Sequence, residues 1–328
     1  MPSTMPIIGV MAAFAALVAT ITQAASQDWP TRPVTMVFPF AAGSAGDVLG
    51  RIFASHLSDL LGQPVIFENV GGAGGMTGAN RVAKAAPDGY QFMLGGTFMA
   101  LNQTLYKKPL YNAASDFAPV ALVADQPLVL IVRKDLPVSN LQEFIAYAKV
   151  NQAKMQYASA GMGSAPHLAC ELLNGAIGVD VVHVPYRGGG AAMQDLIAGR
   201  VDYQCPVSTI ALPQIESKMV KAIAILSKQR LPLLPELASA YEQGATRFDF
   251  EFWFAFFLPK GTPAPIVRKL HDAITATMEM PSVQARLKET GATLVVPERR
   301  SPEYLQGFVT REIEKFAGPI KARGVEIE

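Results

Sequence analysis

Short apolar runs alternate with amphipathic stretches from residue 34 to the end of the chain. An apolar run bounded by Gly, Pro or Ser predicts a buried strand, and apolar residues repeated along one face predict a helix. The first unit is a predicted strand at 34–38, a small-residue loop, and a helix that Asp47 caps and Gly62 ends. Further strands are predicted at 65–67 and 91–94, an order of elements typical of an α/β domain. The apolar face of the helix consists of Val48, Ile52, Phe53, Leu57, Leu60 and Leu61.

The same alternation begins again near residue 124, which predicts a second lobe and a ligand cleft between the two. We expect lobe 1 to contain residues 25–123 and 228–328, and lobe 2 to contain residues 124–227. In lobe 2, strands are predicted at 128–132, 156–159, 181–184, 201–205 and 222–226, with helices at 141–150, 166–177 and 191–198. A last strand is predicted at 250–258, followed by helices at 264–280, 283–289 and 302–320.

The N-terminus has the pattern of an export signal. The first 27 residues contain no charged side chain, residues 7–21 are largely apolar, and the segment Thr22-Gln23-Ala24 has small residues at the positions that a signal peptidase needs. We expect residues 1–24 to be a signal peptide and the mature protein to be periplasmic. Pro6 and Gly9 interrupt the apolar stretch, which makes a permanent transmembrane helix the weaker interpretation. The Lys or Arg that usually begins such a signal is missing.

The charge balance and the cysteines add two constraints. The chain has 28 basic and 27 acidic side chains, and no basic run follows residue 28, so nucleic acid is not an expected partner. The chain has 2 cysteines, Cys170 and Cys205. In an oxidising compartment they can form a disulfide, or they can be two buried thiols, since spacing alone does not show whether their Cα atoms come within about 7 Å.

Two loops place Gly, Ala and Ser directly before a predicted helix, at 40–47 and at 159–165. In such loops the backbone N–H groups can point at an anion, with the helix dipole behind them. Either loop alone could equally be a tight turn between strand and helix. Because one such loop occurs in each lobe, the pair favours a receptor for a carboxylate.

Enzyme signatures are missing from the sequence. A dinucleotide-binding G-x-G-x-x-G fails because Thr77 stands at the third glycine position, and no phosphate-loop motif occurs. Ser44 and Ser164 each follow a glycine directly, which excludes a G-x-S-x-G elbow. The 4 histidines form no H-E-x-x-H pattern. We therefore expect no catalytic residue, no metal and no cofactor.

Two further side chains are candidates for contact with a ligand. His167 lies one turn into the helix behind the second loop, where it can touch the ligand or a water molecule. Arg187 begins the glycine-rich turn 187–190, and its guanidinium is suited to bidentate pairing with a carboxylate. Such a turn is more often only a loop.

Several segments together resemble one known family, the Bug family of periplasmic receptors of tripartite tricarboxylate transporters. They run in the family's order along the chain from about residue 29 to the C-terminus. They are FAAGSAGD at 40–47, EN at 68–69 with GAGG at 72–75, KAAPDGY at 84–90, YASAG at 157–161, HVPYRG at 183–188 and FLPKGTP at 257–263.

The resemblance implies a two-lobed type II periplasmic-binding-protein (Venus-flytrap) fold that is not an enzyme. It implies a small organic carboxylate as ligand, and the membrane subunits of a tripartite tricarboxylate transporter as partners of a monomer. A ligand-sensing receptor for a two-component signalling system is the alternative. The expected ligand-binding residues are Phe40, Ala42, Gly43, Ser44, Ala45, Asp47, Phe98, Ser159, Gly163, Ser164, Ala165, His167 and Pro206.

Three positions depart from the family pattern, so ligand specificity does not transfer from relatives. Ser44 stands where the family commonly has a second glycine, Pro206 where relatives often have Asp, and Phe254 where a polar residue is frequent. Pro206 cannot accept a hydrogen bond from an ammonium group through its side chain. Phe98, Trp253 and Phe254 could line the cleft or equally be core residues. If they line it, a mono- or dicarboxylate without an amine is the favoured ligand.

Overall fold

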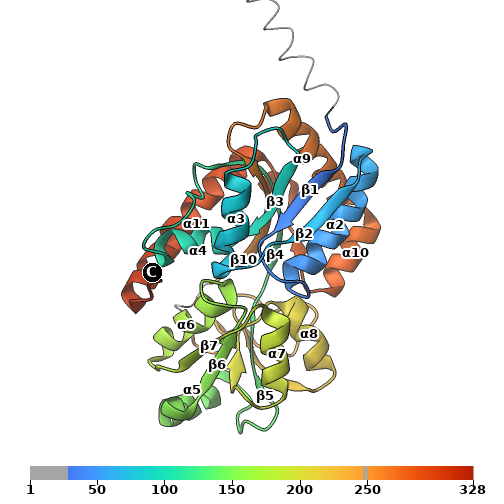
Figure 1. The fold of residues 1–328 in the computed structure, drawn as a ribbon. Helices are drawn as coiled ribbons and strands as arrows, with labels where there is room; N and C mark the ends of the chain where they lie inside the picture. The colour runs from blue at the N-terminus through green and yellow to red at the C-terminus, as the bar shows by residue number, and fades with distance from the viewer. Residues whose placement is uncertain (1–28, 247, 249, 328) are drawn as a thin grey trace, which may run out of the picture.

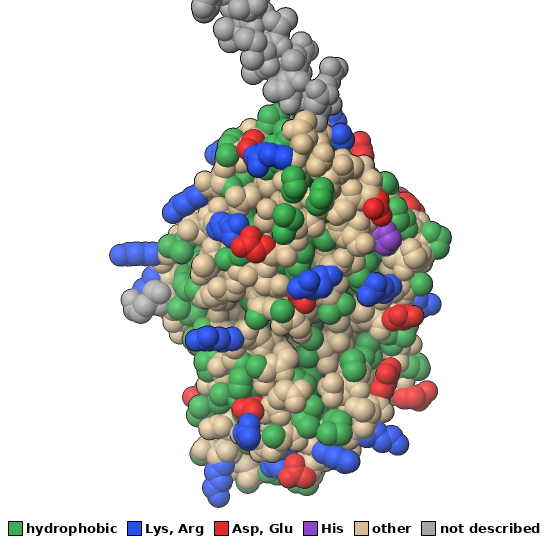
Figure 2. All heavy atoms as spheres, turned by 45° about the vertical axis from the view of Figure 1, so that its right-hand side comes forward, with side chains coloured by type: hydrophobic (Ala, Val, Ile, Leu, Met, Phe, Trp, Pro, Cys, Tyr) green, Lys and Arg blue, Asp and Glu red, His purple; other side chains and the backbone are tan. Residues whose placement is uncertain are grey.

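In the computed structural model, residues 29–246, 248 and 250–327 are described, and they form two α/β lobes, each around its own sheet (Figure 1). The expected signal peptide at 1–24 lies outside the described residues. No helix within the described ranges is long and apolar enough to cross a membrane. On the face shown in Figure 2, basic and acidic side chains are scattered among each other over both lobes.

The upper lobe in Figure 1 has a six-stranded sheet in the order β11-β4-β10-β3-β1-β2. β1 pairs in parallel with β2 and β3, whereas β10 pairs antiparallel with β3 and β4. The strands are β1 (Val34–Phe38), β2 (Val65–Asn69), β3 (Gln91–Gly96), β4 (Phe117–Gln126), β10 (Phe252–Pro259) and β11 (Thr293–Leu294). The helices are α2 (Ala45–Leu61), α3 (Met76–Ala83), α4 (Phe98–Leu105), α9 (Ala264–Glu279), α10 (Pro281–Glu289) and α11 (Pro302–Arg323).

The lower lobe has a five-stranded sheet in the order β7-β6-β8-β5-β9. β6 pairs in parallel with β7 and β8, and β5 pairs antiparallel with β8 and β9. The strands are β5 (Val129–Arg133), β6 (Gln156–Ser159), β7 (Val182–Pro185), β8 (Tyr203–Gln204) and β9 (Val220–Ile225). The helices are α5 (Leu141–Asn151), α6 (Ala165–Ile177), α7 (Gly189–Ile197) and α8 (Ser208–Glu216).

β10 illustrates how the apolar pattern determines the first lobe. Its eight residues, FWFAFFLP, are a continuous apolar run, and all but the first are buried. A strand covered on both faces needs such a run rather than an alternating pattern. β10 accordingly lies between β3 and β4 in the interior of the sheet, and the C-terminal part of the chain thereby returns to the first lobe.

The return to lobe 1 occurs later in the chain than expected. The Ala240 N–H donates to the Ile225 carbonyl (2.7 Å), and the Leu141 N–H donates to the Gln243 side chain (2.8 Å), so residues 226–245 pack on lobe 2. The buried Leu231 belongs to the apolar cluster of that lobe. The boundary predicted at residue 228 is therefore too early, because this segment lacks regular structure and its few leucines give no periodic signal.

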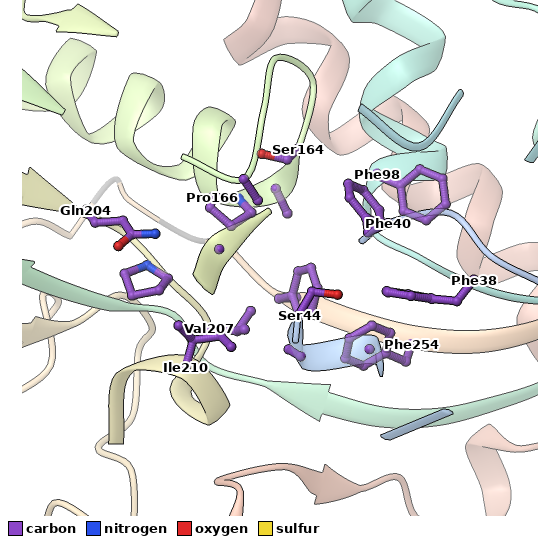
Figure 3. Close-up of a pocket in the computed structure, with 17 residues that line it drawn as sticks. Phe38, Phe40, Ser44, Phe98, Ser164, Pro166, Gln204, Val207, Ile210 and Phe254 are labelled. Carbon is purple, nitrogen blue, oxygen red and sulfur yellow. The ribbon is translucent and has the colours of Figure 1, made fainter. Parts of the chain in front are cut away.

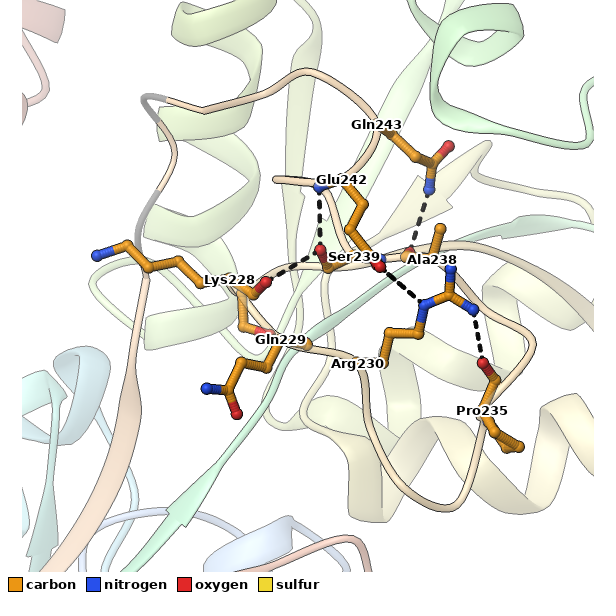
Figure 4. A network of polar contacts seen from close by, with 9 residues as sticks. Lys228, Gln229, Arg230, Pro235, Ala238, Ser239, Glu242 and Gln243 are labelled. Atoms are coloured by element: carbon orange, nitrogen blue, oxygen red, sulfur yellow. Dashed lines mark hydrogen bonds and ion pairs between the residues drawn. The ribbon is translucent and has the colours of Figure 1, made fainter.

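Polar contacts inside this segment hold its shape (Figure 4). The Arg230 guanidinium pairs with Glu242 at 3.0 Å and donates to the Pro235 carbonyl at 2.7 Å. The Ser239 hydroxyl accepts from the Glu242 N–H and donates to the Lys228 carbonyl. These contacts satisfy backbone groups that a loop cannot pair within a sheet or helix.

Asp47 does not cap α2, contrary to the prediction. Ser44 has the extended backbone of an N-cap residue, with φ −87° and ψ 165°, and α2 begins at the next residue. Asp47 lies in the first turn, where its carboxylate accepts hydrogen bonds from the Gly43 N–H and the Arg51 guanidinium. A carboxylate in the first turn faces the positive end of the helix dipole, so Asp47 still stabilises α2 from this position.

The two cysteines form a disulfide in lobe 2. Cys170 on α6 and Cys205 directly after β8 are both fully buried, with Cα atoms 5.6 Å apart. This separation lies within the usual range for a disulfide. The bond ties α6 to the end of β8, two elements that are 35 residues apart in sequence.

We predict that removing this bond lowers the free energy of unfolding by about 3 to 4 kcal/mol, because the closed loop restricts the unfolded chain. Urea unfolding of the Cys170→Ala/Cys205→Ala variant measures the loss. Wild-type protein with its disulfide reduced is the control and should lose a similar amount. An unfolding midpoint that is the same with and without the bond would contradict the prediction.

Candidate functional site

A pocket lies between the lobes, beyond the carboxyl ends of β1, β6 and β8 (Figure 3). Ligands of open α/β sheets bind at this edge, where loops lead from strands into helices. Residues of both lobes contribute to its wall, and no charged side chain is among the described residues that line it. The lining residues are Phe38, Phe40, Ser44, Ala45, Gly46, Phe98, Ala160, Ser164, Ala165, Pro166, Gly189, Gln204, Pro206, Val207, Ile210, Phe252 and Phe254.

Lobe 1 contributes the N-terminus of α2. The first N–H groups of a helix have no acceptor within the helix. In α2 the N–H groups of Asp47 and Val48 turn back to the Ser44 carbonyl. The N–H groups of Ala45 and Gly46, both in the pocket wall, have no acceptor among the described residues. They are therefore available to an anion.

An aromatic wall packs directly against this turn of α2. A Cβ at Gly46 would lie 2.3 Å from ring atoms of Phe38 and 2.9 Å from Phe254, distances that real Cβ atoms do not adopt. Only glycine therefore lets both rings contact the helix start. Phe40 and Phe98 continue the wall, with ring centroids 5.2 Å apart in an edge-to-face arrangement.

Lobe 2 contributes the N-terminus of α6, and Ser164 is its N-cap. The Ser164 hydroxyl donates to the Gly161 carbonyl at 2.7 Å and accepts from the His167 N–H at 3.4 Å. Its one hydrogen is therefore already used within the loop. Pro166 has no N–H, so the Ala165 N–H is the donor that this helix start directs to the pocket wall.

Two stacked histidines support the second loop from behind. The rings of His167 and His183 lie 4.2 Å apart, and Tyr157 stacks on His183 at 4.8 Å. His183 Nε2 is 2.7 Å from the Ser159 hydroxyl, and His167 Nδ1 accepts from the Gly163 N–H. Burial lowers the pKa of His167 to about 4, and burial together with His167 lowers that of His183 to about 3. Both rings are neutral at pH 7 and act as supports for the loop.

Asp47 supports the first loop in a comparable way. Burial acts to raise its pKa, but hydrogen bonds from Arg51, the Gly43 N–H and Asn69 lower the pKa below its ordinary value overall. The carboxylate is thus ionised and held by Arg51 in an ion pair of 3.0 Å. Asp47 is buried next to the pocket without lining it.

The structure brings together seven of the predicted residues and places the others around them. Those in the pocket wall are Phe40, Ser44, Ala45, Phe98, Ser164, Ala165 and Pro206. Ala42 and Gly43 are exposed on the loop before α2. Ser159 and Gly163 lie within the second loop and His167 lies behind it on α6, and none of the three is in the pocket wall. The ligand contacts predicted for all of these residues stay predictions.

Sequence reasoning missed several lining residues and could not orient others. Phe252 and Phe254 line the pocket, whereas Trp253 points to the opposite face of β10 and donates to Glu312 at 3.0 Å. The period of two along a strand separates these residues once β10 is recognised. Gln204, by contrast, carries no signal in the sequence. The remaining residues that were missed are Phe38, Gly46, Ala160, Pro166, Gly189, Val207 and Ile210.

A second hollow adjoins the pocket and shares Phe40 and Ala160 with it. It is lined by the glycine-rich segment 71–75 of lobe 1 and by residues 160–162 and 186–187 of lobe 2. The two sides touch, because a Cβ at Gly74 would lie 2.4 Å from the Met162 carbonyl oxygen. Arg187 is exposed at this rim and not in the pocket wall.

The fold and the interlobe pocket define the class of periplasmic solute-binding proteins. The periplasmic binding protein BugD has a similar structure, with a TM-score of 0.87 and 40% sequence identity over 92% of this chain and 100% of BugD. MatC of Rhodopseudomonas palustris, solved with bound malate, superposes with a TM-score of 0.86 at 38% identity, over 89% of this chain and 100% of MatC. BugT of Bordetella pertussis is 32% identical over 330 residues, which cover 100% of this chain and 99% of BugT.

The model of the tripartite tricarboxylate transporter family receptor, TctC, matches residues 49–325. The chain belongs to this family, and the resemblance to the Bug family is confirmed. The family is one of solute-binding receptors and not of enzymes, as expected. Membership of a family of periplasmic binding proteins implies a periplasmic location.

We predict that the histidine stack makes the protein less stable in acid. Between pH 6.5 and about 4 the unfolded chain takes up protons on His167 and His183 that the folded protein does not bind. The free energy of unfolding therefore falls as the pH is lowered through this window. Urea unfolding at pH 7 and pH 4.5 should show a smaller fall for His167→Gln than for wild type.

His56→Gln serves as the matched control for the loss of an imidazole, because His56 lies on α2 outside the stack. It should retain the wild-type fall between the two pH values. An equal fall in His167→Gln and wild type would show that the stack does not cause the acid sensitivity.

Proposed function

We propose that this protein captures a small mono- or dicarboxylate without an amine between its lobes. It acts in the periplasm as a monomer and delivers the acid to the membrane subunits of a tripartite tricarboxylate transporter. The observation that carries the proposal is the convergence of two helix N-termini on one pocket whose described lining residues include no charged side chain. The malate bound to the related MatC supports a carboxylate as the ligand class.

The two helix starts supply the attraction for the acid. Each helix N-terminus carries the equivalent of roughly half a positive charge, and its first N–H groups point outward. The available donors are those of Ala45 and Gly46 on one side and Ala165 on the other. A ligand with one carboxylate at the start of α6, and with a second carboxylate or an apolar group near the start of α2, would contact both lobes.

The positive charge of the two helix ends disfavours an amino acid as the ligand. An ammonium group in the pocket would lie between two positive helix ends, and burying a charge without a partner is costly. The acidic side chain next to the pocket, Asp47, is already paired with Arg51 and bonded to the Gly43 N–H. The aromatic wall of Phe38, Phe98 and Phe254 suits a hydrocarbon or aromatic body.

We predict that amine-free acids stabilise the protein and amino acids do not. A bound ligand raises the melting temperature by mass action. A thermal-shift panel should compare adipate, citrate, benzoate and terephthalate with aspartate and glutamate. Shifts with aspartate or glutamate alone would contradict the exclusion of an amine. A panel of acids in which none shifts the melting temperature would contradict carboxylate capture itself.

A second prediction tests the backbone donor on α6 without removing a side-chain group. Ala165 is the first residue of α6, a position where proline fits a helix, and Ser164 before it is extended, as a residue before proline must be. Ala165→Pro therefore deletes one N–H and keeps the helix. Losing a hydrogen bond to a charged group costs about 1.5 to 3 kcal/mol, so calorimetry should show roughly 10- to 150-fold weaker binding of the best acid in the panel.

Ala165→Val is the matched control, because it adds a similar number of carbons and keeps the N–H. We expect it to bind the acid more tightly than Ala165→Pro, and both variants to unfold cooperatively. If the two variants lose the same affinity, the added bulk and not the lost donor explains the effect, and the assignment of Ala165 fails.

A further inference from the structure

One polar side chain in the pocket wall makes no hydrogen bond within the part of the chain that the structure describes. Gln204 lies at the end of β8 and is fully buried. Neither its Nε2 nor its Oε1 has a hydrogen-bond partner among the described residues. Figure 3 shows it at one end of the pocket, with its amide turned toward the other lining residues.

Strand pairing and the disulfide place Gln204 beside the start of α6, where the proposed function puts the carboxylate. β8 pairs in parallel with β6, with Gln204 opposite Ala158, and β6 leads into the loop that ends at Ala165. Cys205, the next residue, is bonded to Cys170 on α6. The disulfide therefore ties the backbone that carries Gln204 to the helix that presents the Ala165 N–H.

The apolar side chains near the Gln204 amide give it no hydrogen-bond partner. Its neighbours in the wall include Pro206, Val207 and Ile210, which have no polar side-chain atom. Neither amide atom is accessible to solvent or has a partner among the described residues. A buried donor or acceptor without a partner is costly, so a ligand that reaches both amide atoms and pairs with them gains affinity.

The two amide atoms require different partners, and this restricts the ligand. A carboxylate accepts from Nε2 but leaves Oε1 facing negative charge, and a hydrocarbon satisfies neither atom. A neutral group that both donates and accepts can serve both atoms. The requirement holds whichever way the amide is turned, because both of its ends are unpartnered.

We propose that Gln204 makes the receptor selective for carboxylates that carry a neutral hydrogen-bonding group, a hydroxyl or a carboxamide, over the corresponding hydrocarbon acids. This inference rests on the proposed capture of an amine-free carboxylate and names the substrate class within it. The carboxylate lies on the Ala165 N–H, and the neutral group of the same ligand bonds the Gln204 amide.

The test compares acids that differ in one group. Calorimetry measures 3-phenylpropionate against 2-hydroxy-3-phenylpropionate, and hexanoate against adipic acid monoamide, on the wild-type protein. We expect the hydroxyl or the carboxamide member to bind at least about tenfold more tightly than its parent, because a site built for a hydrogen-bonding group rejects the analogue that lacks it. The two pairs show whether the protein prefers a hydroxyl or a carboxamide as the hydrogen-bonding group of its ligand.

Gln204→Met keeps the length of the side chain and removes both polar atoms. It should bring the two members of the favoured pair to within about twofold of each other, with the parent acid bound as well as before or better. The melting temperature of the free variant should equal or exceed that of wild type, because an unpartnered amide has left the interior. Gln214→Met on α8, outside the pocket wall, is the control and should keep the wild-type preference.

The outcomes separate the two proposals. If members of both pairs bind wild type with equal affinity, selection by Gln204 is wrong while carboxylate capture stands. If Gln204→Met keeps the preference, another residue reads the group and the assignment to Gln204 is wrong. If none of these acids and no member of the thermal-shift panel binds, carboxylate capture fails and the inference fails with it.

Discussion

On the proposed function, an acid between these lobes relies on backbone N–H groups to balance its charge, because no charged side chain is among the described residues that line the pocket. The starts of α2 and α6 must therefore face the pocket with their first donors available. A serine stands at the N-cap position of each helix, and the third and fourth donors of α2 are already used by the Ser44 carbonyl. Most other features of the site follow from keeping these two helix ends in place.

The two lobes meet this constraint by different means. In lobe 1 the helix start is held by close packing, since Gly46 admits Phe38 and Phe254 at distances that a Cβ would forbid. In lobe 2 the helix start is held by a neutral histidine stack behind the loop and by the disulfide to α6. Neither the close packing nor the histidine stack with the disulfide places a charged side chain in the pocket wall. The positive ends of the two helix dipoles therefore favour a negatively charged ligand.

Much of the fold could be predicted from sequence because its strands are short apolar runs and its helices end at glycines, as at Gly62 and Gly178. Three of the elements that were missed contain residues that normally interrupt regular structure. Gly78 lies within α3, Pro119 within β4 and Pro213 within α8. Their stability comes from packing in the complete fold, which a local pattern does not contain. The loops at α2 and α6 were predictable because small residues before a helix have a direct physical meaning. Gln204 was not, since its role arises only from burial without a partner.

The most direct test of this account is a crystal structure of the protein with the acid that binds best in the panel. We expect a carboxylate oxygen within about 3 Å of the Ala165 nitrogen, and the other end of the ligand against the start of α2 near Ala45. A ligand whose carboxylate is paired with Arg187 at the rim, or which lies outside the interlobe pocket, would contradict the claim that backbone donors at two helix ends hold the acid.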